Sequence, residues 1–203
     1  MHPTLLIVDD FFDNAMDLRE AALRLTYPEG RPTPYPGRNS LQRINITGLE
    51  AQVSRLLNEP LVPMTPPESH AMCRLTLTHD NGPSRVHIDP SHWSGILYLS
   101  RNEDSQGGTD FFRHIRTDTH QAPIEKDELA AHGYPSVQEM TEDIIQKDGL
   151  DDSKWERTMR VPMRFNRLVL LRPWLWHTAG PGFGDRPENG RLIYLMFFQS
   201  AQA

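Results

Sequence analysis

The chain has 203 residues and fits one domain with a real core, because chains of this length bury well over half of their unfolded surface. Its 17 prolines and 13 glycines indicate short elements joined by turns, and its formal net charge of −6 argues against a nucleic-acid-binding surface, which usually shows as a basic patch. The single cysteine, Cys73, excludes an intrachain disulfide and a structural zinc site built from several cysteines, and it fits a reducing compartment.

The N-terminal region, residues 1–70, is predicted to supply one strand and supporting helices. Residues 4–8 form an apolar run that ends at two aspartates, which suits a short strand and is too short for a signal peptide. Residues 15–25 and 49–57 have apolar side chains at helical spacing, and the proline-rich stretch 28–38 between them is predicted to be irregular. No stretch approaches the roughly 20 apolar residues of a membrane span, so we expect a cytoplasmic protein without a membrane partner.

Short strands separated by turn signals predominate from residue 71 onward. Met72–Thr78 alternates polar with apolar side chains, as a half-buried strand does. Turn signals rich in glycine lie at residues 81–83, 106–108 and 180–185. Several short strands with such breaks favour a β-sandwich or a jelly roll. The further strands are predicted at residues 93–99, 109–114, 164–171 and 192–198.

Residues 115–160 interrupt this succession of strands. The stretch is charged, and residues 137–146 within it are predicted to be helical. We therefore expect an insertion between two parts of the jelly-roll core, residues 71–114 and residues 161–203. The insertion could be an active-site lid, in which case Trp155 could contact substrate, or a plain surface excursion, since the two look alike in sequence.

His87, Asp89 and His177 are the candidate metal ligands. His87 and Asp89 are separated by one residue, so both side chains project from the same face of a strand. His177 follows a buried-type strand and lies among aromatic and apolar residues, where its ring nitrogens need partners. Two imidazoles and one carboxylate can occupy one face of Fe(II) and leave three positions open. The alternatives are a capping aspartate beside a surface histidine and a satisfied core histidine.

Arg191 is the candidate anion-binding residue. It opens the nearly continuous apolar segment 192–198, and a guanidinium beside a buried strand almost requires an anion because it cannot deprotonate. The anion could be Asp185 or Glu188 in a salt bridge, or a dicarboxylate ligand held in a bidentate pair. Arg186 is a rival in the same region, but it lies in a polar loop.

Three other histidines carry weaker expectations. His79 and His92 flank the His87-x-Asp89 pair and could ligate a metal, but both lie in polar turns where an exposed position is expected. His114 follows two phenylalanines on a predicted strand and could line a pocket.

The order of these pieces resembles the 2-oxoglutarate- and Fe(II)-dependent oxygenase superfamily, in its prolyl-4-hydroxylase-like branch, and one stretch, Arg164–Leu170, resembles an uncharacterised bacterial subgroup. The resemblance covers nearly the whole chain apart from residues 115–161. It departs from the family in the spacing between the distal histidine and the arginine, which is a few residues longer than usual. The matching pieces are Leu5–Phe12, His87-Ile88-Asp89, Gly95–Ser100, Gly107–Phe112, His177 and Arg191.

This resemblance implies a mainly β fold with flanking helices and a double-stranded β-helix core, a cupin-like jelly roll. It implies that His87, Asp89 and His177 bind iron. It also implies that 2-oxoglutarate chelates this iron through its keto oxygen and adjacent carboxylate, with Arg191 on its distal carboxylate. Tyr98 matches a tyrosine that some relatives use to assist that arginine.

The implied activity is that of a dioxygenase that consumes 2-oxoglutarate and dioxygen, releases succinate and CO2, and hydroxylates an unactivated carbon. The substrate would be a small molecule or an amino-acid-like group. Asp89 favours hydroxylation, because related halogenases have a small residue in place of that carboxylate. Two alternatives stay open: a catalytically silent jelly-roll binding or sensor module, and a cupin-type metalloenzyme that does not use 2-oxoglutarate. Exposed edge strands would also allow a homodimer.

Overall fold

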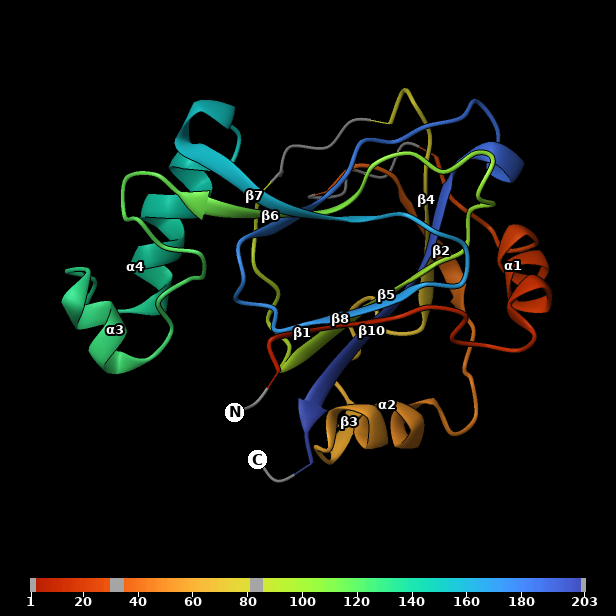
Figure 1. Ribbon diagram of the computed structural model, residues 1–203, viewed down its shortest axis with the longest axis horizontal. Coiled ribbons are helices and arrows are strands. Elements are labelled where there is room, and N and C mark those ends of the chain that lie inside the picture. Colours follow the sequence, from red (N-terminus) through yellow and green to blue (C-terminus); the bar gives the residue numbers. More distant parts are fainter. Residues whose placement is uncertain (1–2, 30–34, 81–85, 202–203) are drawn as a thin grey trace.

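Two antiparallel β-sheets that face each other form the centre of the computed structural model, which describes residues 3–29, 35–80 and 86–201 (Figure 1). The strands are β1 (Leu5–Val8), β2 (Arg38–Arg43), β3 (Leu61–Pro63), β4 (Met72–Thr76), β5 (Trp93–Tyr98), β6 (Gly108–His114), β7 (Trp155–Pro162), β8 (Leu168–Leu171), β9 (His177–Ala179) and β10 (Arg191–Ser200). The large sheet has the order β1-β8-β5-β10-β4-β2, with β3 paired to β10, and the small sheet has the order β7-β6-β9. The predicted jelly roll is confirmed.

The outer face of the large sheet packs on two helices, α1 (Ala15–Leu23) and α2 (Leu49–Leu57). In α2, Leu49, Val53 and Leu57 are buried at four-residue spacing and therefore form one apolar stripe. The helix ends at Asn58, whose left-handed conformation (φ 53°) cannot continue it. The helix predicted at residues 49–57 is confirmed.

Both faces of the large sheet are covered, which explains why β10 reads as a continuous apolar run. Alternate side chains of β10, from Leu192 to Phe198, join the core beneath the helices. The other set, with Ile193 and Leu195, faces the space between the two sheets and meets Tyr98 there. A strand buried on both faces has no polar side, so its sequence does not alternate.

The region around the predicted insertion contains one strand more than expected. Residues 155–160, predicted to lie outside the strands, begin β7, which pairs with β6 along its whole length. The prediction is wrong there because the side chains between Trp155 and Val161 are exposed, so the strand has no apolar alternation. The strand β2 was likewise not predicted, because its sequence, Arg-Asn-Ser-Leu-Gln-Arg, is mostly polar. The turn predicted at residues 81–83 lies outside the described residues.

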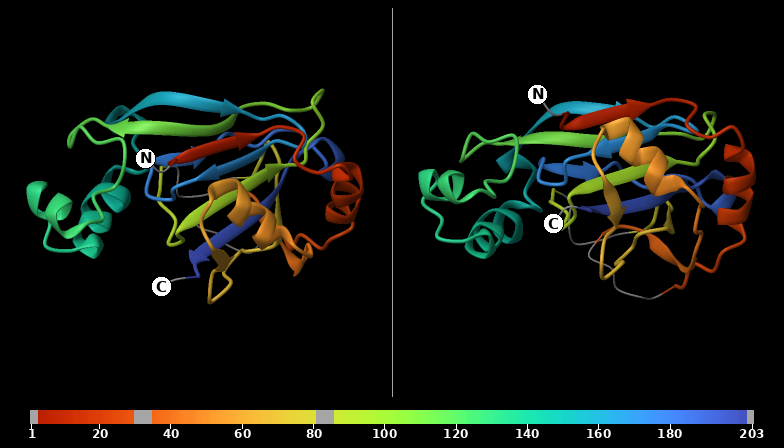
Figure 2. Two further views of the ribbon diagram at one scale, coloured as in Figure 1. Left: turned by 60° about the horizontal axis from the view of Figure 1, so that its bottom comes forward. Right: turned by 90° about the horizontal axis from the view of Figure 1, so that it is seen from below.

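Residues 115–154 form a lobe that extends from one end of the sandwich (Figure 2). It contains α3 (Lys126–Ala131), which was not predicted, and α4 (Val137–Thr141), which continues as a π-helical turn over Glu142–Gln146 and confirms the helix predicted at residues 137–146. The lobe packs on the sandwich through a small apolar cluster, in which its Met140 and Ile144 join Trp155 of β7 and Trp176. Within the described residues, no helix is both long and apolar enough to cross a bilayer.

Two histidines outside the candidate site are buried and explain an expected dependence of stability on pH. His70 accepts a hydrogen bond from the Phe197 backbone N–H at 2.9 Å, and the His114 ring contacts Thr117 and Asp148 at 2.8 and 3.0 Å. Burial lowers the pKa of both imidazoles below their ordinary value of 6.5. His114 therefore belongs to the core of the lobe, and the expectation that it could line the site is wrong.

The free energy of unfolding should therefore fall as the pH is lowered below about 6.5. Above that pH both imidazoles are neutral in the folded and the unfolded chain, whereas below it the unfolded chain takes up protons that the folded chain does not. The loss should be at most about 1.4 kcal/mol per pH unit for each histidine. Urea denaturation at pH 5, 6 and 7 would measure it. His114→Gln should flatten the slope, and His132→Gln, at an exposed position, should not.

Candidate metal centre and its cavity

The backbone brings His87 and His177 together although they are far apart in the sequence. The two residues form an antiparallel bridge, in which the His87 N–H donates to the His177 carbonyl at 2.9 Å and the His177 N–H donates back at 3.3 Å. The N–H of Asp89 donates to the Pro173 carbonyl at 3.2 Å. This bond ties the segment that carries His87 and Asp89 to the chain just after β8. Main-chain bonds therefore set the spacing of the three candidate ligands.

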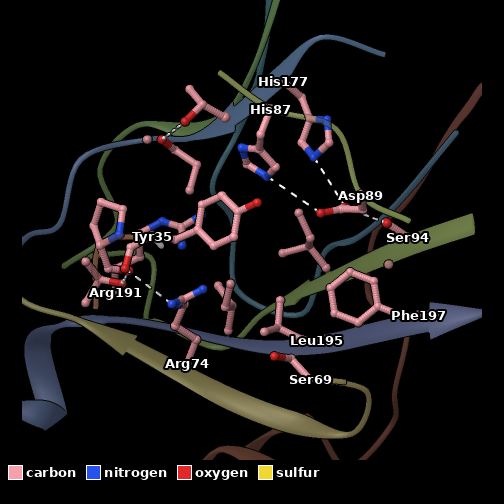
Figure 3. Close-up of a pocket in the computed structure, with 18 residues that line it drawn as sticks. Tyr35, Ser69, Arg74, His87, Asp89, Ser94, His177, Arg191, Leu195 and Phe197 are labelled. Carbon is pink, nitrogen blue, oxygen red and sulfur yellow. Dashed lines mark hydrogen bonds and ion pairs between the residues drawn. The ribbon is translucent and has the colours of Figure 1, made fainter. Parts of the chain in front are cut away.

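The side chains of His87, Asp89 and His177 converge at one end of a cavity (Figure 3). One ligand atom from each residue lies within 4.8 Å of the other two. The Asp89 Oδ1 and Oδ2 atoms lie 3.7 and 3.5 Å from Nε2 of His87 and His177, respectively. A metal ion with bonds of about 2.0–2.2 Å to nitrogen and oxygen ligands would lie among these atoms.

Hydrogen bonds orient two of these side chains for a metal. The Nδ1 atom of His177 lies 2.7 Å from the Leu175 carbonyl, which can only accept, so Nδ1 carries the proton and Nε2 offers its lone pair. The Ser94 hydroxyl donates to Asp89 Oδ2 at 2.6 Å. A neutral imidazole fixed by a carbonyl and a carboxylate held by a hydroxyl are the arrangement that metal sites use. The three residues therefore fit a divalent metal.

The Asp89 side chain is ionised over a wide pH range. Burial raises its pKa, but the neighbouring His177 and His87 side chains and the Ser94 hydroxyl, which donates to it, outweigh that effect and bring the pKa down to about 2. The carboxylate is thus ready to take a cation at neutral pH.

Arg191 lines the same cavity, whose volume is about 120 Å³. The side chain is 1% exposed, and within the described part of the chain its Nε and Nη2 atoms have no hydrogen-bond partner. The two acids proposed as partners are engaged elsewhere: Asp185 accepts from Asn189, and Glu188 lies 3.8 Å from Arg186. Burial lowers the pKa of Arg191. A buried guanidinium with unsatisfied nitrogens requires an anion, and the described residues do not supply one.

Tyr98 lies near Arg191 but does not line the cavity. Its hydroxyl shares a hydrogen bond of 2.6 Å with the Thr109 hydroxyl, and the residue is fully buried. Burial raises the pKa of Tyr98, and the positive charge of Arg191 opposes this rise. Contact of Tyr98 with a co-substrate stays a prediction.

Arg74 and Tyr35 line the cavity and were not predicted (Figure 3). Arg74 belongs to a strand that alternates polar with apolar residues, and such a pattern normally places polar side chains in solvent. Here the polar side of β4 faces the space between the sheets. The Tyr35 ring lies 4.4 Å from the ring of His87, centroid to centroid. Tyr35 belongs to the proline-rich stretch 28–38, which carries no sequence signal for a site. Only the register of β4 could have indicated Arg74.

Among the described residues, the rival histidines do not belong to the group that could hold a metal. His79 is exposed, as expected. His92 is partly exposed, and its Nε2 atom lies 2.9 Å from Glu59. Arg186 is exposed, as predicted for a residue in a polar loop. Trp155 is buried and donates its indole N–H to the Asp148 carbonyl at 2.8 Å.

A second groove, of about 630 Å³, reaches Asp89 from outside the sandwich. Ile124 and Val137 of the lobe line it together with Pro90 and Trp174. No residue of 115–160 lines the inner cavity, so the predicted lid would act on this outer groove. That role stays a prediction.

The comparisons with known proteins agree with this architecture. A model described as "Family of unknown function (DUF6445)" matches residues 2–198. None of the curated proteins is similar enough in sequence to match the chain.

Solved structures match the chain over 98% of its length, and three of them have the following similarity. HygX from Streptomyces hygroscopicus, with nickel, 2-oxoglutarate and hygromycin B bound, is 13% identical over 83% of its own length, with a TM-score of 0.52. A Trichoplax adhaerens prolyl hydroxylase, in complex with a hypoxia inducible factor peptide fragment, is 11% identical over 84%, with a TM-score of 0.52. SnoK, an alpha ketoglutarate dependent carbocyclase from nogalamycin biosynthesis, is 13% identical over 81%, with a TM-score of 0.57. The chain therefore has the double-stranded β-helix fold of the 2-oxoglutarate-dependent oxygenases, as the resemblance implied.

Proposed function

The chain belongs to the DUF6445 family, a family of unknown function, and we propose that it is an Fe(II)- and 2-oxoglutarate-dependent dioxygenase that hydroxylates a carbon of a small or amino-acid-like substrate. One observation carries the proposal: a His-Asp-His set and a buried, anion-requiring arginine line the same cavity. The fold supports it, because this architecture is the one that HygX uses with 2-oxoglutarate and a divalent metal.

Each residue of the cavity has a role in this proposal. His87, Asp89 and His177 would hold Fe(II) as its three protein ligands. Arg191 binds the distal carboxylate of 2-oxoglutarate in a bidentate pair, and Tyr98, which is buried near it, assists Arg191. When bound, iron and 2-oxoglutarate supply the oxidising chemistry: dioxygen gives one oxygen atom to succinate and one to the substrate C–H bond, with loss of CO2.

The protein's own contribution is to bind, orient and exclude water. Ile193, Leu195 and Phe197 form an apolar floor beneath the ligands, and both sheets cover it. A low-dielectric floor strengthens the attraction between Arg191 and a carboxylate, because water cannot screen it there. Ser94 holds Asp89 in place, so the carboxylate keeps its orientation before and after metal binding.

Two other functions can be distinguished from the proposed one by experiment. A silent binding module would bind metal and 2-oxoglutarate but would form no succinate. A cupin-type metalloenzyme without 2-oxoglutarate would leave Arg191 without a ligand, and 2-oxoglutarate would not affect it. The buried Nε and Nη2 atoms of Arg191, which have no partner among the described residues, favour the dioxygenase over the second of these.

Anaerobic titration of the purified protein with Fe(II) and 2-oxoglutarate tests the proposal. We expect a weak visible charge-transfer band of the chelated keto acid, and, on admission of air, slow formation of succinate even without substrate. A protein that binds no Fe(II) at micromolar concentrations would show that the proposed function is wrong. Binding without any succinate would identify the silent module instead.

A further inference from the structure

The inner cavity has room for a co-substrate but not for a primary substrate as well. Its volume is about 120 Å³, so a metal ion and 2-oxoglutarate would fill it and leave no space for a second organic molecule. The outer groove also includes a metal ligand, because Asp89 lines both spaces, and its volume is about 630 Å³. Small-molecule sites usually measure ~300–1,000 Å³. A further hollow of about 580 Å³ is lined by none of the three ligands, so the outer groove is the better place for a substrate.

Apolar side chains from two parts of the chain line the outer groove. Ile88, Pro90 and Trp174 come from the segments around the metal ligands, and Ile124 and Val137 come from the lobe. Val137 is 39% exposed, so this apolar side chain stays in contact with water unless a ligand covers it. Burial of apolar surface is favourable, and such a lining therefore suits the apolar part of a small molecule.

The charges near Trp174 compensate each other. The guanidinium carbon of Arg172 lies 4.1 Å from the ring centre of Trp93 and 5.4 Å from that of Trp174. The same guanidinium pairs with the Glu59 carboxylate. His92, which also lines the groove, has its Nε2 atom 2.9 Å from that carboxylate. The described residues of this wall therefore offer no uncompensated positive charge that would select an acid.

The lobe places a negative charge next to the groove. It has ten acidic and four basic residues, so its formal net charge of −6 equals that of the whole chain. Glu125 directly follows Ile124, and the Glu128 Oε2 atom accepts a hydrogen bond from the Ile124 N–H at 3.3 Å. Glu139 lies two residues after Val137, and within the described part of the chain Glu125 and Glu139 are exposed and form no ion pair. An acidic surface of this kind attracts cations and repels anions.

We propose that the primary substrate is a small organic amine with an apolar part, which binds in the outer groove against Trp174 and Val137. This inference rests on the proposed function, because it places the carbon to be oxidised at the end of the groove beside Asp89. The ammonium group lies toward the acidic lobe. An acid of the same shape is repelled by the lobe, and a neutral molecule of that shape lacks the attraction.

The test compares molecules that share an apolar skeleton and differ in charge. The panel contains the amine, the alcohol and the carboxylic acid of a phenylpropyl, an indolylethyl and an octyl skeleton. Calorimetry measures binding to the anaerobic protein with Fe(II) and 2-oxoglutarate, and again without either, because the groove lies outside the inner cavity. The rate of succinate formation in air, with and without each compound, is the second readout.

We expect at least one amine to bind with a dissociation constant of about 1 mM or lower and to raise succinate formation. At low ionic strength its alcohol should bind about three-fold more weakly, and its acid about ten-fold more weakly. Added salt should narrow these differences, because it screens the charge of the lobe.

One pair of variants tests the groove. Val137→Trp puts a larger side chain into the groove at an exposed position and should weaken binding of the amine about five-fold or more. Leu150→Trp is the matched control, because Leu150 is another exposed apolar residue of the lobe and does not line the groove. It should bind the amine as wild type does.

A second pair of variants tests the charge. Glu125→Gln combined with Glu139→Gln should weaken the amine about two- to five-fold at low ionic strength and leave the alcohol unaffected. Asp17→Asn combined with Glu20→Gln removes the same charge from α1, which lies at the opposite end of the molecule (Figure 1). This control should bind all three compounds as wild type does.

Four outcomes would overturn the inference. Alcohols or acids that bind as tightly as their amines would show that the lobe does not select a cation, and a panel without any binding amine would show that no such site exists. Binding that Val137→Trp leaves intact would lie outside the groove. An amine that binds without raising succinate formation would be a ligand and not a substrate. Failure of the proposed function is distinct from all four, because wild type would then give neither the charge-transfer band nor succinate with or without any compound.

Discussion

His177→Ala is expected to lower the affinity for Fe(II) by at least 100-fold and to abolish the charge-transfer band with 2-oxoglutarate. His177 supplies one of three candidate ligands, and its ring is fixed by the Leu175 carbonyl with Nε2 turned toward Asp89. Loss of a residue that only orients a ligand costs about 10- to 100-fold in metal affinity, so loss of a ligand should cost more. Anaerobic titration with Fe(II), followed by absorbance, measures the effect.

His79→Ala is the matched control, because His79 is an exposed histidine that could also be considered a ligand from the sequence. It should bind Fe(II) as wild type does. Equal loss of binding in the two variants, or wild-type affinity in His177→Ala, would show that the metal is held elsewhere. Circular dichroism of both variants would confirm that the β-sandwich is intact.

Arg191→Gln is expected to raise the dissociation constant for 2-oxoglutarate by ~30-fold or more while the affinity for Fe(II) changes little. Truncating one partner of a buried, hydrogen-bonded charge pair costs about 2–5 kcal/mol, and 1.4 kcal/mol is a factor of ten. The side chain is 1% exposed, so water cannot take the place of the lost guanidinium. The charge-transfer band, titrated with 2-oxoglutarate at saturating Fe(II), gives the constant directly.

The matched control is Arg186→Gln, which removes an exposed arginine from the loop just before Arg191. Its dissociation constant should equal that of wild type. A second control uses the ligand: 2-oxobutyrate lacks the distal carboxylate, so Arg191→Gln should affect its binding far less. If both keto acids lost affinity equally, Arg191 would not contact the distal carboxylate.

Elements with a regular apolar pattern could be predicted from the sequence, and elements without one could not. The helix α2 has three leucine or valine side chains on one stripe and a left-handed residue at its end, so its bounds follow from local physics. The strand β7 has exposed side chains from Glu156 to Arg160, so its strand conformation depends on pairing with β6, which no local pattern reveals. For this reason the insertion was predicted to end at residue 160, whereas β7 already begins at Trp155.

The candidate site shows the same division. His87, Asp89 and His177 could be proposed because their residue types suit one metal, and the structure does bring them together. Arg74 could not, since a polar residue in an alternating strand normally faces solvent. In this fold a second sheet covers that side of β4, so the polar positions face a cavity instead. Deciding between the two requires knowledge of tertiary contacts.

The reciprocal backbone pairing of His87 with His177 has a consequence for how the metal is acquired. A long loop must close before this pairing forms, and closure of long loops is a late, entropically costly step of folding. A nascent chain that ends before β9 holds only His87 and Asp89, too few ligands to retain iron. Under the proposed function, the site can therefore hold iron only after the sandwich has closed around it.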